Sequence, residues 1–120
     1  MPRVCVRNWN LGTQELEALF KNLPTIVSET LHIEEVKEAH LTVEDIEVVI
    51  EQSNRDLDIR GYKDFFVTVE AMHFPQREAR RNELAEVMVA RIKSVVDHAR
   101  QFSVWLTPPI AGYAEKNLPW

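Results

Sequence analysis

Pro2-Arg3-Val4-Cys5-Val6-Arg7, near the start of the sequence, is the stretch that decides the fold. Valines alternate here with smaller or charged residues, and this period of two predicts a strand with one buried face. The stretch Phe66-Val67-Thr68-Val69-Glu70 shows the same alternation in the second half of the sequence. We therefore expect one strand over residues 3–9 and a matching strand over residues 65–74.

Each of these strands is followed by an amphipathic helical pattern and then by another strand. Pro24 lies inside the first helical pattern, where we expect it to kink the helix or tighten a turn. In order, the predicted elements are strand 3–9, helix 13–31, strand 42–51, strand 65–74, helix 76–98 and strand 102–107. The order strand–helix–strand therefore occurs twice.

Two tandem β-α-β units of this size predict an α/β (α+β) fold: one four-stranded mixed sheet with both helices on one face. We expect a single domain over residues 1–120, with pseudo-repeats over about 2–52 and 64–107 and a C-terminal tail over 108–120. The other face of the sheet would mix apolar and polar side chains. Self-association is the simplest way to cover such a face.

Composition excludes several classes of protein. The formal charge of −5 and a pI near 5.4 argue against a nucleic-acid partner, which would require a basic face. No apolar run approaches the ~20 residues that span a bilayer, and no signal peptide is evident, so we expect a cytoplasmic protein without a membrane partner. A single cysteine, Cys5, fits a reducing compartment.

Cofactor and metal chemistry are not expected either. The three glycines, Gly12, Gly61 and Gly112, form no phosphate-binding loop. The four histidines show neither a His-x-His nor a His-Glu-x-x-His spacing, which are the short spacings typical of metal sites. These histidines are His32, His40, His73 and His98.

Pro2 is the candidate catalytic residue. An initiator methionine is normally removed before a small residue such as proline, which would leave Pro2 as a free secondary amine. An α-amine has a pKa near ~8, and a dry or cationic environment lowers that value toward neutrality. Such a group is suited to act as a general base. If Met1 is retained, the Pro2 nitrogen is a tertiary amide and has no basicity.

The Met1-Pro2 start, the two tandem β-α-β units and a sheet face in need of partners together resemble the tautomerase superfamily. This superfamily includes macrophage migration inhibitory factor and 5-carboxymethyl-2-hydroxymuconate isomerase. The resemblance spans the whole chain and is strongest to a small bacterial branch with no assigned function. That branch shares a helix with an internal proline, like Asn22-Leu23-Pro24-Thr25, and a strand like Phe66-Val67-Thr68-Val69-Glu70.

The resemblance implies a homotrimer whose active sites lie near the subunit boundaries. It also implies a small-molecule carboxylate substrate, a proton moved by the amino-terminal proline, and no cofactor. Cationic side chains would hold the substrate carboxylate and an apolar wall would lower the proline pKa. The candidate substrate-binding residues are Arg55, Arg60, Lys63, His73, Arg77, Trp105 and Tyr113.

Each of these candidates also has a structural interpretation, which is a subunit contact for His73 and core or interface packing for Trp105 and Tyr113. Arg55, Arg60 and Lys63 stand among aspartates and are equally typical of loop charges. Arg77 lies with Arg80 and Arg81 at the start of the second predicted helix, where Glu78 and Glu83 are interleaved with the arginines, as in an ion-paired surface. The first helix lacks the arginine that short-chain members place after its first turn, so substrate identity cannot be transferred.

Two functions therefore remain open. The first is a cofactor-independent tautomerase or isomerase that transfers a proton in a small 2-hydroxy-dienoate or 2-oxo acid, with Pro2 as general base. The second is a non-catalytic trimeric protein that uses the same fold for interaction or as a scaffold. Removal of Met1 is required by the first function and not by the second.

Overall fold

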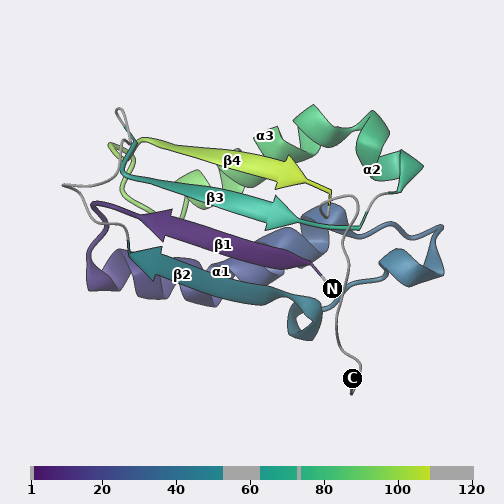
Figure 1. Ribbon diagram of the computed structural model, residues 1–120, viewed down its shortest axis with the longest axis horizontal. Helices are drawn as coiled ribbons and strands as arrows, with labels where there is room; N and C mark the ends of the chain where they lie inside the picture. Colours follow the sequence, from purple (N-terminus) through teal and green to yellow (C-terminus); the bar gives the residue numbers. More distant parts are fainter. Residues whose placement is uncertain (1, 53–62, 73, 109–120) are drawn as a thin grey trace, which may run out of the picture.

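The computed structural model of the chain describes residues 2–52, 63–72 and 74–108. Its strands and helices follow one another in two similar halves (Figure 1). The elements are β1 (Arg3–Asn8), α1 (Thr13–Leu31), the 3-10 turns η1 (Lys37–Ala39) and η2 (Val43–Asp45), β2 (Glu47–Gln52), β3 (Phe65–Glu70), α2 (Pro75–Ala79), α3 (Arg81–Lys93) and β4 (Phe102–Thr107). None of the helices in the described part of the chain is long and apolar enough to cross a bilayer.

The four strands form one mixed sheet in the order β2-β1-β3-β4. Strand β1 is parallel to β2, and β3 is parallel to β4, as a helical crossover within each half requires. The two halves join in the middle of the sheet, where β1 and β3 run antiparallel with Arg3 opposite Glu70 and Asn8 opposite Phe65. The predicted fold of two β-α-β units in a four-stranded mixed sheet is therefore confirmed.

Both long helices lie on the same face of the sheet (Figure 1). The alternation along the strands decides which side chains meet them, because successive residues of a strand point to opposite faces. Val4 and Val6 of β1 and Phe65, Val67 and Val69 of β3 are fully buried under the helices. The helices supply the rest of the core from Leu19, Leu23, Val27, Leu31, Leu84, Met88 and Ile92.

The opposite face of the sheet is open in the single chain. A row across its middle consists of Val49, Cys5, Thr68 and Trp105, which are register partners on successive strands. Trp105 is 60% exposed. Burial raises the pKa of the Cys5 thiol, so this side chain is held in the weakly nucleophilic thiol form. The mixture of polar and apolar side chains expected on this face is the one observed.

Two strand boundaries differ from the sequence prediction. Strand β2 begins at Glu47 and not at residue 42, because Thr42 and Asp45 form a capping box that starts a 3-10 turn. Strand β3 ends at Glu70 and not at residue 74. The extended residue Phe74 instead becomes the N-cap of α2, as expected of a residue that precedes a proline.

The second helical region is also divided. A single helix over residues 76–98 was predicted, but α2 ends at Ala79 and α3 begins at Arg81 and ends at Lys93. The break lies at Arg80, whose backbone leaves the helical region at φ −117° and ψ 16°. Helix α1, in contrast, continues through Pro24 as one element. Arg77 of the short α2 is buried, whereas Arg80 and Arg81, at and after the break, are exposed.

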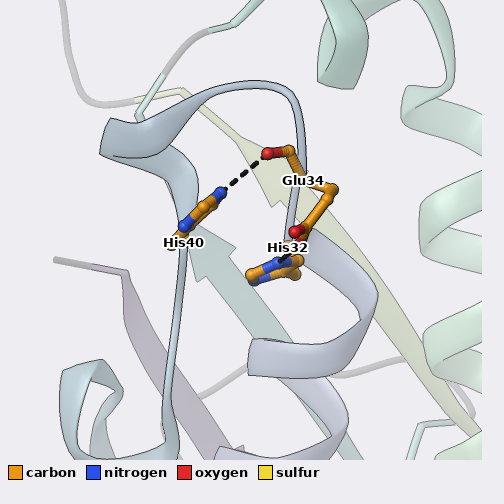
Figure 2. Close-up of side chains that lie close together, drawn as sticks. All are labelled: His32, Glu34 and His40. Carbon is orange, nitrogen blue, oxygen red and sulfur yellow. Dashed lines mark hydrogen bonds and ion pairs between the residues drawn. The ribbon is translucent and has the colours of Figure 1, made fainter.

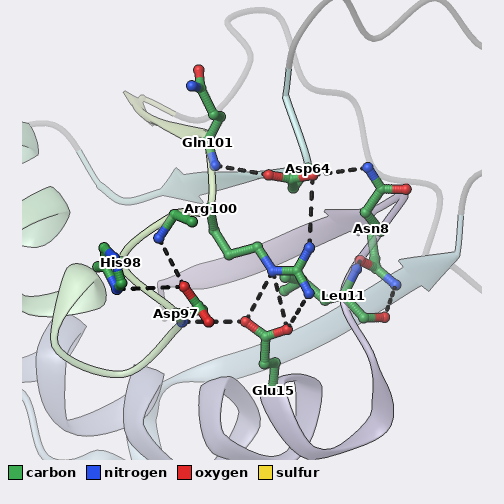
Figure 3. A network of polar contacts seen from close by, with 10 residues as sticks. Asn8, Leu11, Glu15, Asp64, Asp97, His98, Arg100 and Gln101 are labelled. Carbon is green, nitrogen blue, oxygen red and sulfur yellow. Dashed lines mark hydrogen bonds and ion pairs between the residues drawn. The ribbon is translucent and has the colours of Figure 1, made fainter.

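A polar network closes the end of the sheet at which β1 ends and β3 begins (Figure 3). Arg100 donates to both carboxylate oxygens of Glu15, with the shortest distance 2.6 Å, and its Nη1 lies 3.9 Å from Asp64. The hydrogen bond from Arg100 lowers the pKa of the Glu15 carboxyl group. These contacts join the start of α1 to the segments before β3 and β4. Pro2 lies at the opposite end of the sheet.

Candidate functional site

Pro2 lies at the start of the central strand β1 and is buried. Its carbonyl oxygen accepts a hydrogen bond of 3.1 Å from the backbone N–H of Glu47, which anchors it to β2. On the other side, the antiparallel register of Arg3 with Glu70 places Pro2 beside Ala71. The residue is therefore held between two neighbouring strands and shielded from water.

Ala71 is also part of the lining of a cavity of about 220 Å³. The cavity lies where β3 and β4 end and α2 begins, at the same end of the sheet as Pro2 (Figure 1). Its walls combine apolar side chains with two arginines and one glutamate. The lining residues are Ala71, Met72, Phe74, Arg77, Glu78, Arg81, Leu106, Thr107 and Pro108. A small cavity of mixed polarity next to a buried proline is suited to a small polar ligand.

Arg77 is the most unusual group of this cavity, because its side chain is charged and the residue is only 6% exposed. Its Nε and Nη2 atoms donate to the carbonyl oxygen of Leu31, at 3.0 and 2.9 Å, and Nη1 donates to that of Met72 at 2.9 Å. The guanidinium also lies over the ring of Phe74, 4.9 Å from its centre. Helix α1, the segment after β3 and helix α2 are thus tied together by one side chain.

The hydrogen-bond acceptors of Arg77 among the described residues are all backbone carbonyls, which carry no net charge. Burial lowers the pKa of the guanidinium, although arginine remains protonated in proteins. A buried cation that faces only neutral dipoles leaves part of its charge uncompensated. A carboxylate entering the cavity would compensate it, so the site is suited to an organic acid.

The other charged groups of the cavity are already matched. Arg81 forms an ion pair with Glu78, three residues before it, on the exposed surface of the helical segment. Arg80, which does not line the cavity, pairs with Glu83. The ion-paired interpretation of this arginine-rich segment therefore describes Arg80 and Arg81. Arg77 differs from them by pointing inward.

Two further predicted residues lie apart from this cavity within one chain. Lys63 is exposed and precedes β3, so it lies beyond the far end of the sheet, eight residues or about 26 Å of extended chain from Ala71, the neighbour of Pro2. Trp105 lies on β4 beside a second hollow of about 390 Å³, which is lined by residues of α3 and β4. Arg55, Arg60, His73 and Tyr113 fall outside the described residues.

The sequence prediction did not include Met72, Phe74 and Leu31, which hold Arg77 in place. A signal for Phe74 was present, since the residue before a proline is pushed into an extended conformation and interrupts the helix. No local signal marks Leu31, because its role depends on a carbonyl oxygen at the end of a helix 46 residues away in the sequence.

Comparison with solved structures identifies the fold of this chain. No protein-family model matches the sequence, and no curated protein is significantly similar to it. Among solved structures, a domain of unknown function (DUF1904) from Sebaldella termitidis superposes with a TM-score of 0.60 and 14% identity, over 98% of each chain. A macrophage migration inhibitory factor-like protein from Entamoeba histolytica superposes with a TM-score of 0.57 and 9% identity, over 89% of this chain and 85% of that one.

A third similar structure is Pt0534 inactivated by 2-oxo-3-pentynoate, with a TM-score of 0.56, 12% identity and 92% of each chain covered. At these identities the similarity concerns the path of the backbone alone. The chain therefore has the fold of proteins similar to macrophage migration inhibitory factor.

Proposed function

We propose that this protein is a cofactor-independent tautomerase or isomerase that moves a proton in a small 2-oxo or 2-hydroxy-dienoic acid. After removal of Met1, the secondary amine of Pro2 is the general base. The observation that carries the proposal is a buried cation, Arg77, in a small cavity whose lining includes Ala71, the residue beside buried Pro2 in the register of the sheet. A base and an anion-binding group at one end of one sheet are the two parts that the reaction needs.

In this mechanism the substrate carboxylate compensates the charge of Arg77. The Pro2 amine takes the hydroxyl proton of the enol, and the resulting ammonium returns a proton to carbon, which gives the keto form. Protons balance over the cycle, and no electron donor or acceptor is needed. Burial lowers the pKa of an amine because it disfavours the charged form, which brings the base closer to neutral pH.

We further propose that the protein is a homotrimer assembled through the open face and the edges of the sheet. Trp105 is exposed on this face, next to the edge of the sheet. In such an assembly, Lys63 or Trp105 of one protomer would complete the site of the next. We also propose that substrate is bound by Arg55, Arg60, His73 and Tyr113, as the resemblance to the tautomerase superfamily implies. Light scattering coupled to size-exclusion chromatography measures the number of subunits directly.

The proposal is tested in three steps on the full chain. Mass spectrometry of the intact protein should show that Met1 is absent. Ketonisation of enol phenylpyruvate, followed by ultraviolet absorbance, should be faster with the protein than without it. Pro2→Ala, which still permits methionine removal, should lower the rate by about 10²-fold, since a positioned general base contributes 10²–10⁴-fold. Arg80→Gln is the matched control and should leave the rate unchanged.

A second assay measures the amine itself. The acetylenic 2-oxo acid 2-oxo-3-pentynoate should add once to Pro2, and the pH dependence of this addition reports the pKa of the amine. An apparent pKa of about 6–7 supports general-base catalysis. A retained Met1, or an amine that titrates near 9, would exclude the mechanism.

A non-catalytic role is the second candidate, and one specific observation favours it. The Nε, Nη1 and Nη2 atoms of Arg77 already donate to the carbonyl oxygens of Leu31 and Met72, so the side chain also works as a structural clamp. A scaffold protein would need the clamp and no ligand. If the protein is a scaffold, Pro2→Ala should keep the wild-type fold and oligomeric state. The wild-type protein itself should then show no ketonisation activity.

A further inference from the structure

Three side chains with metal-binding donor atoms meet in the segment between α1 and β2, away from the Pro2 cavity. His32 is the C-cap residue of α1, Glu34 follows two residues later, and His40 comes directly after η1. One ligand atom from each of these three residues lies within 4.8 Å of the others. Figure 2 shows the two imidazoles and the glutamate gathered on one side of the segment.

The backbone holds this arrangement in a closed loop. The N–H of Ile33 donates to the carbonyl oxygen of Ala39 at 3.2 Å, and the N–H of Ala39 donates to that of Val36 at 2.9 Å. Both Ile33 and Ala39 are buried, with Ala39 fully inaccessible. His32 and Glu34 flank Ile33, and His40 follows Ala39, so two pinned core residues place all three side chains. The backbone positions are therefore set without any ion.

The contacts within the cluster show which donor atoms are in place. His32 Nε2 lies 2.8 Å from Glu34 Oε2, so an imidazole nitrogen and a carboxylate oxygen are already in contact. His40 Nε2 donates to the backbone carbonyl oxygen of Glu34 at 2.7 Å, which orients that ring. The two imidazoles stack with their centres 4.9 Å apart.

We propose that His32, Glu34 and His40 bind one divalent transition-metal ion of the zinc, cobalt or nickel class. Two imidazoles and one carboxylate suit these ions, whereas calcium and magnesium prefer oxygen ligands alone. Three protein ligands leave at least one position for water. Bonds of about 2.0–2.2 Å to the ion require the three donors to approach each other. All three residues are exposed, so their side chains are free to rotate inward.

The hydrogen bond between His32 Nε2 and Glu34 Oε2 is replaced by bonds from both groups to the ion, and one further hydrogen bond must open, which limits the affinity. The N–H of Leu41 donates to His32 Nδ1 at 3.1 Å, so the neutral ring carries its proton on Nε2. Coordination through Nε2 moves this proton to Nδ1, with no net release from the ring, and turns the Leu41 amide to water. The loss of one hydrogen bond weakens binding by about tenfold. The tautomer of His32 therefore becomes a direct reporter of binding.

The location gives the ion a structural consequence. His32 follows Leu31, whose carbonyl oxygen is the main acceptor for Arg77. An ion that links the end of α1 to the segment before β2 would stabilise this helix end. The metal site does not depend on the proposed enzymatic function. It can be present or absent whether or not the protein proves to be a tautomerase.

The test uses the full-length protein with Zn²⁺ in calorimetric titrations and Co²⁺ in absorption spectra. We expect one ion per chain, and we expect His40→Ala and Glu34→Gln to weaken binding at least about tenfold. His98→Ala is the matched control, because the side chain of His98 is 97% exposed beside a single carboxylate, that of Asp97. It should bind like wild type. Nitrogen-15 spectra of the imidazoles should show His32 changing tautomer as Zn²⁺ is added.

Several results would overturn the metal site. Absence of Zn²⁺ binding up to millimolar concentration would do so, as would equal losses of affinity in His98→Ala and His40→Ala. Binding that leaves the His32 ring in its original tautomer would place the ion elsewhere. Because the three residues are exposed, circular dichroism should show that Glu34→Gln and His40→Ala remain folded, and a loss of binding is then attributable to the ligand itself.

Discussion

Replacing Arg77 with methionine is the sharpest test of the candidate site, because it removes the charge and keeps a long side chain over Phe74. The replacement leaves two carbonyl oxygens, those of Leu31 and Met72, without their donors. A buried polar group without a partner costs about 1–3 kcal/mol. Removal of a desolvated charge offsets part of this cost. We therefore expect Arg77→Met to lower the free energy of unfolding by about 2–4 kcal/mol.

Urea unfolding followed by circular dichroism measures this change. With a slope of about 2 kcal/mol/M, typical of urea unfolding of a small protein, the loss corresponds to a fall in the unfolding midpoint of about 1–2 M. Arg80→Met is the matched control, since it removes an exposed arginine that is paired with Glu83. Surface pairs of this kind contribute at most about 1 kcal/mol. Arg77→Lys should fall between the two, because an ammonium group keeps the charge and lacks the planar fork.

The comparison separates the two roles of Arg77. If Arg77→Met were as stable as Arg80→Met, the clamp inferred from the hydrogen bonds would be wrong. If the clamp is real and a carboxylate also binds, phenylpyruvate should raise the unfolding midpoint of the wild type but not that of Arg77→Met, which lacks the charge. A ligand that stabilises both proteins equally would refute the assignment of Arg77 as the anion-binding group.

Three other predictions concern the rest of the molecule. Glu15→Gln should lower the free energy of unfolding by about 1 kcal/mol at neutral pH. In a protein that already carries Arg100→Met, adding Glu15→Gln should cause no further loss. The hydrogen bond from Arg100 lowers the pKa of the Glu15 carboxyl group in the folded protein. The stabilisation is therefore present above the unfolded pKa of this group and is lost as the pH falls through the folded pKa. Acid titration of the wild type and of Glu15→Gln should show this loss. Phe65→Ala should destabilise by about 3–5 kcal/mol in urea, because the ring is fully buried and stacks on Phe102 at 4.8 Å. Trp105→Glu should reduce the oligomer measured by light scattering without changing the circular dichroism spectrum, and an unchanged subunit number would remove the open face from the interface.

The outline of the fold could be predicted from the sequence because its signals are local. The alternation in Val4-Cys5-Val6 and in Val67-Thr68-Val69 predicts both the strands and the faces on which their side chains lie. The boundaries were less accurate, since they depend on caps. Thr42 and Asp45 form a capping box that delays β2, and Arg80 interrupts the second helix. These features involve side-chain hydrogen bonds and backbone angles that a hydrophobic pattern does not contain.

The sequence by itself determined two β-α-β halves, a core on one sheet face and a proline at the root of a strand. Only the tertiary structure decided that Arg77 turns inward while its neighbours stay on the surface, and that His32, Glu34 and His40 meet. The physical reason is the range of the interactions. Periodicity acts over a few residues, whereas the clamp on Leu31 joins segments 46 residues apart in the sequence. The loop that pairs Ile33 with Ala39 is set by backbone hydrogen bonds and burial, which a hydrophobic pattern does not contain.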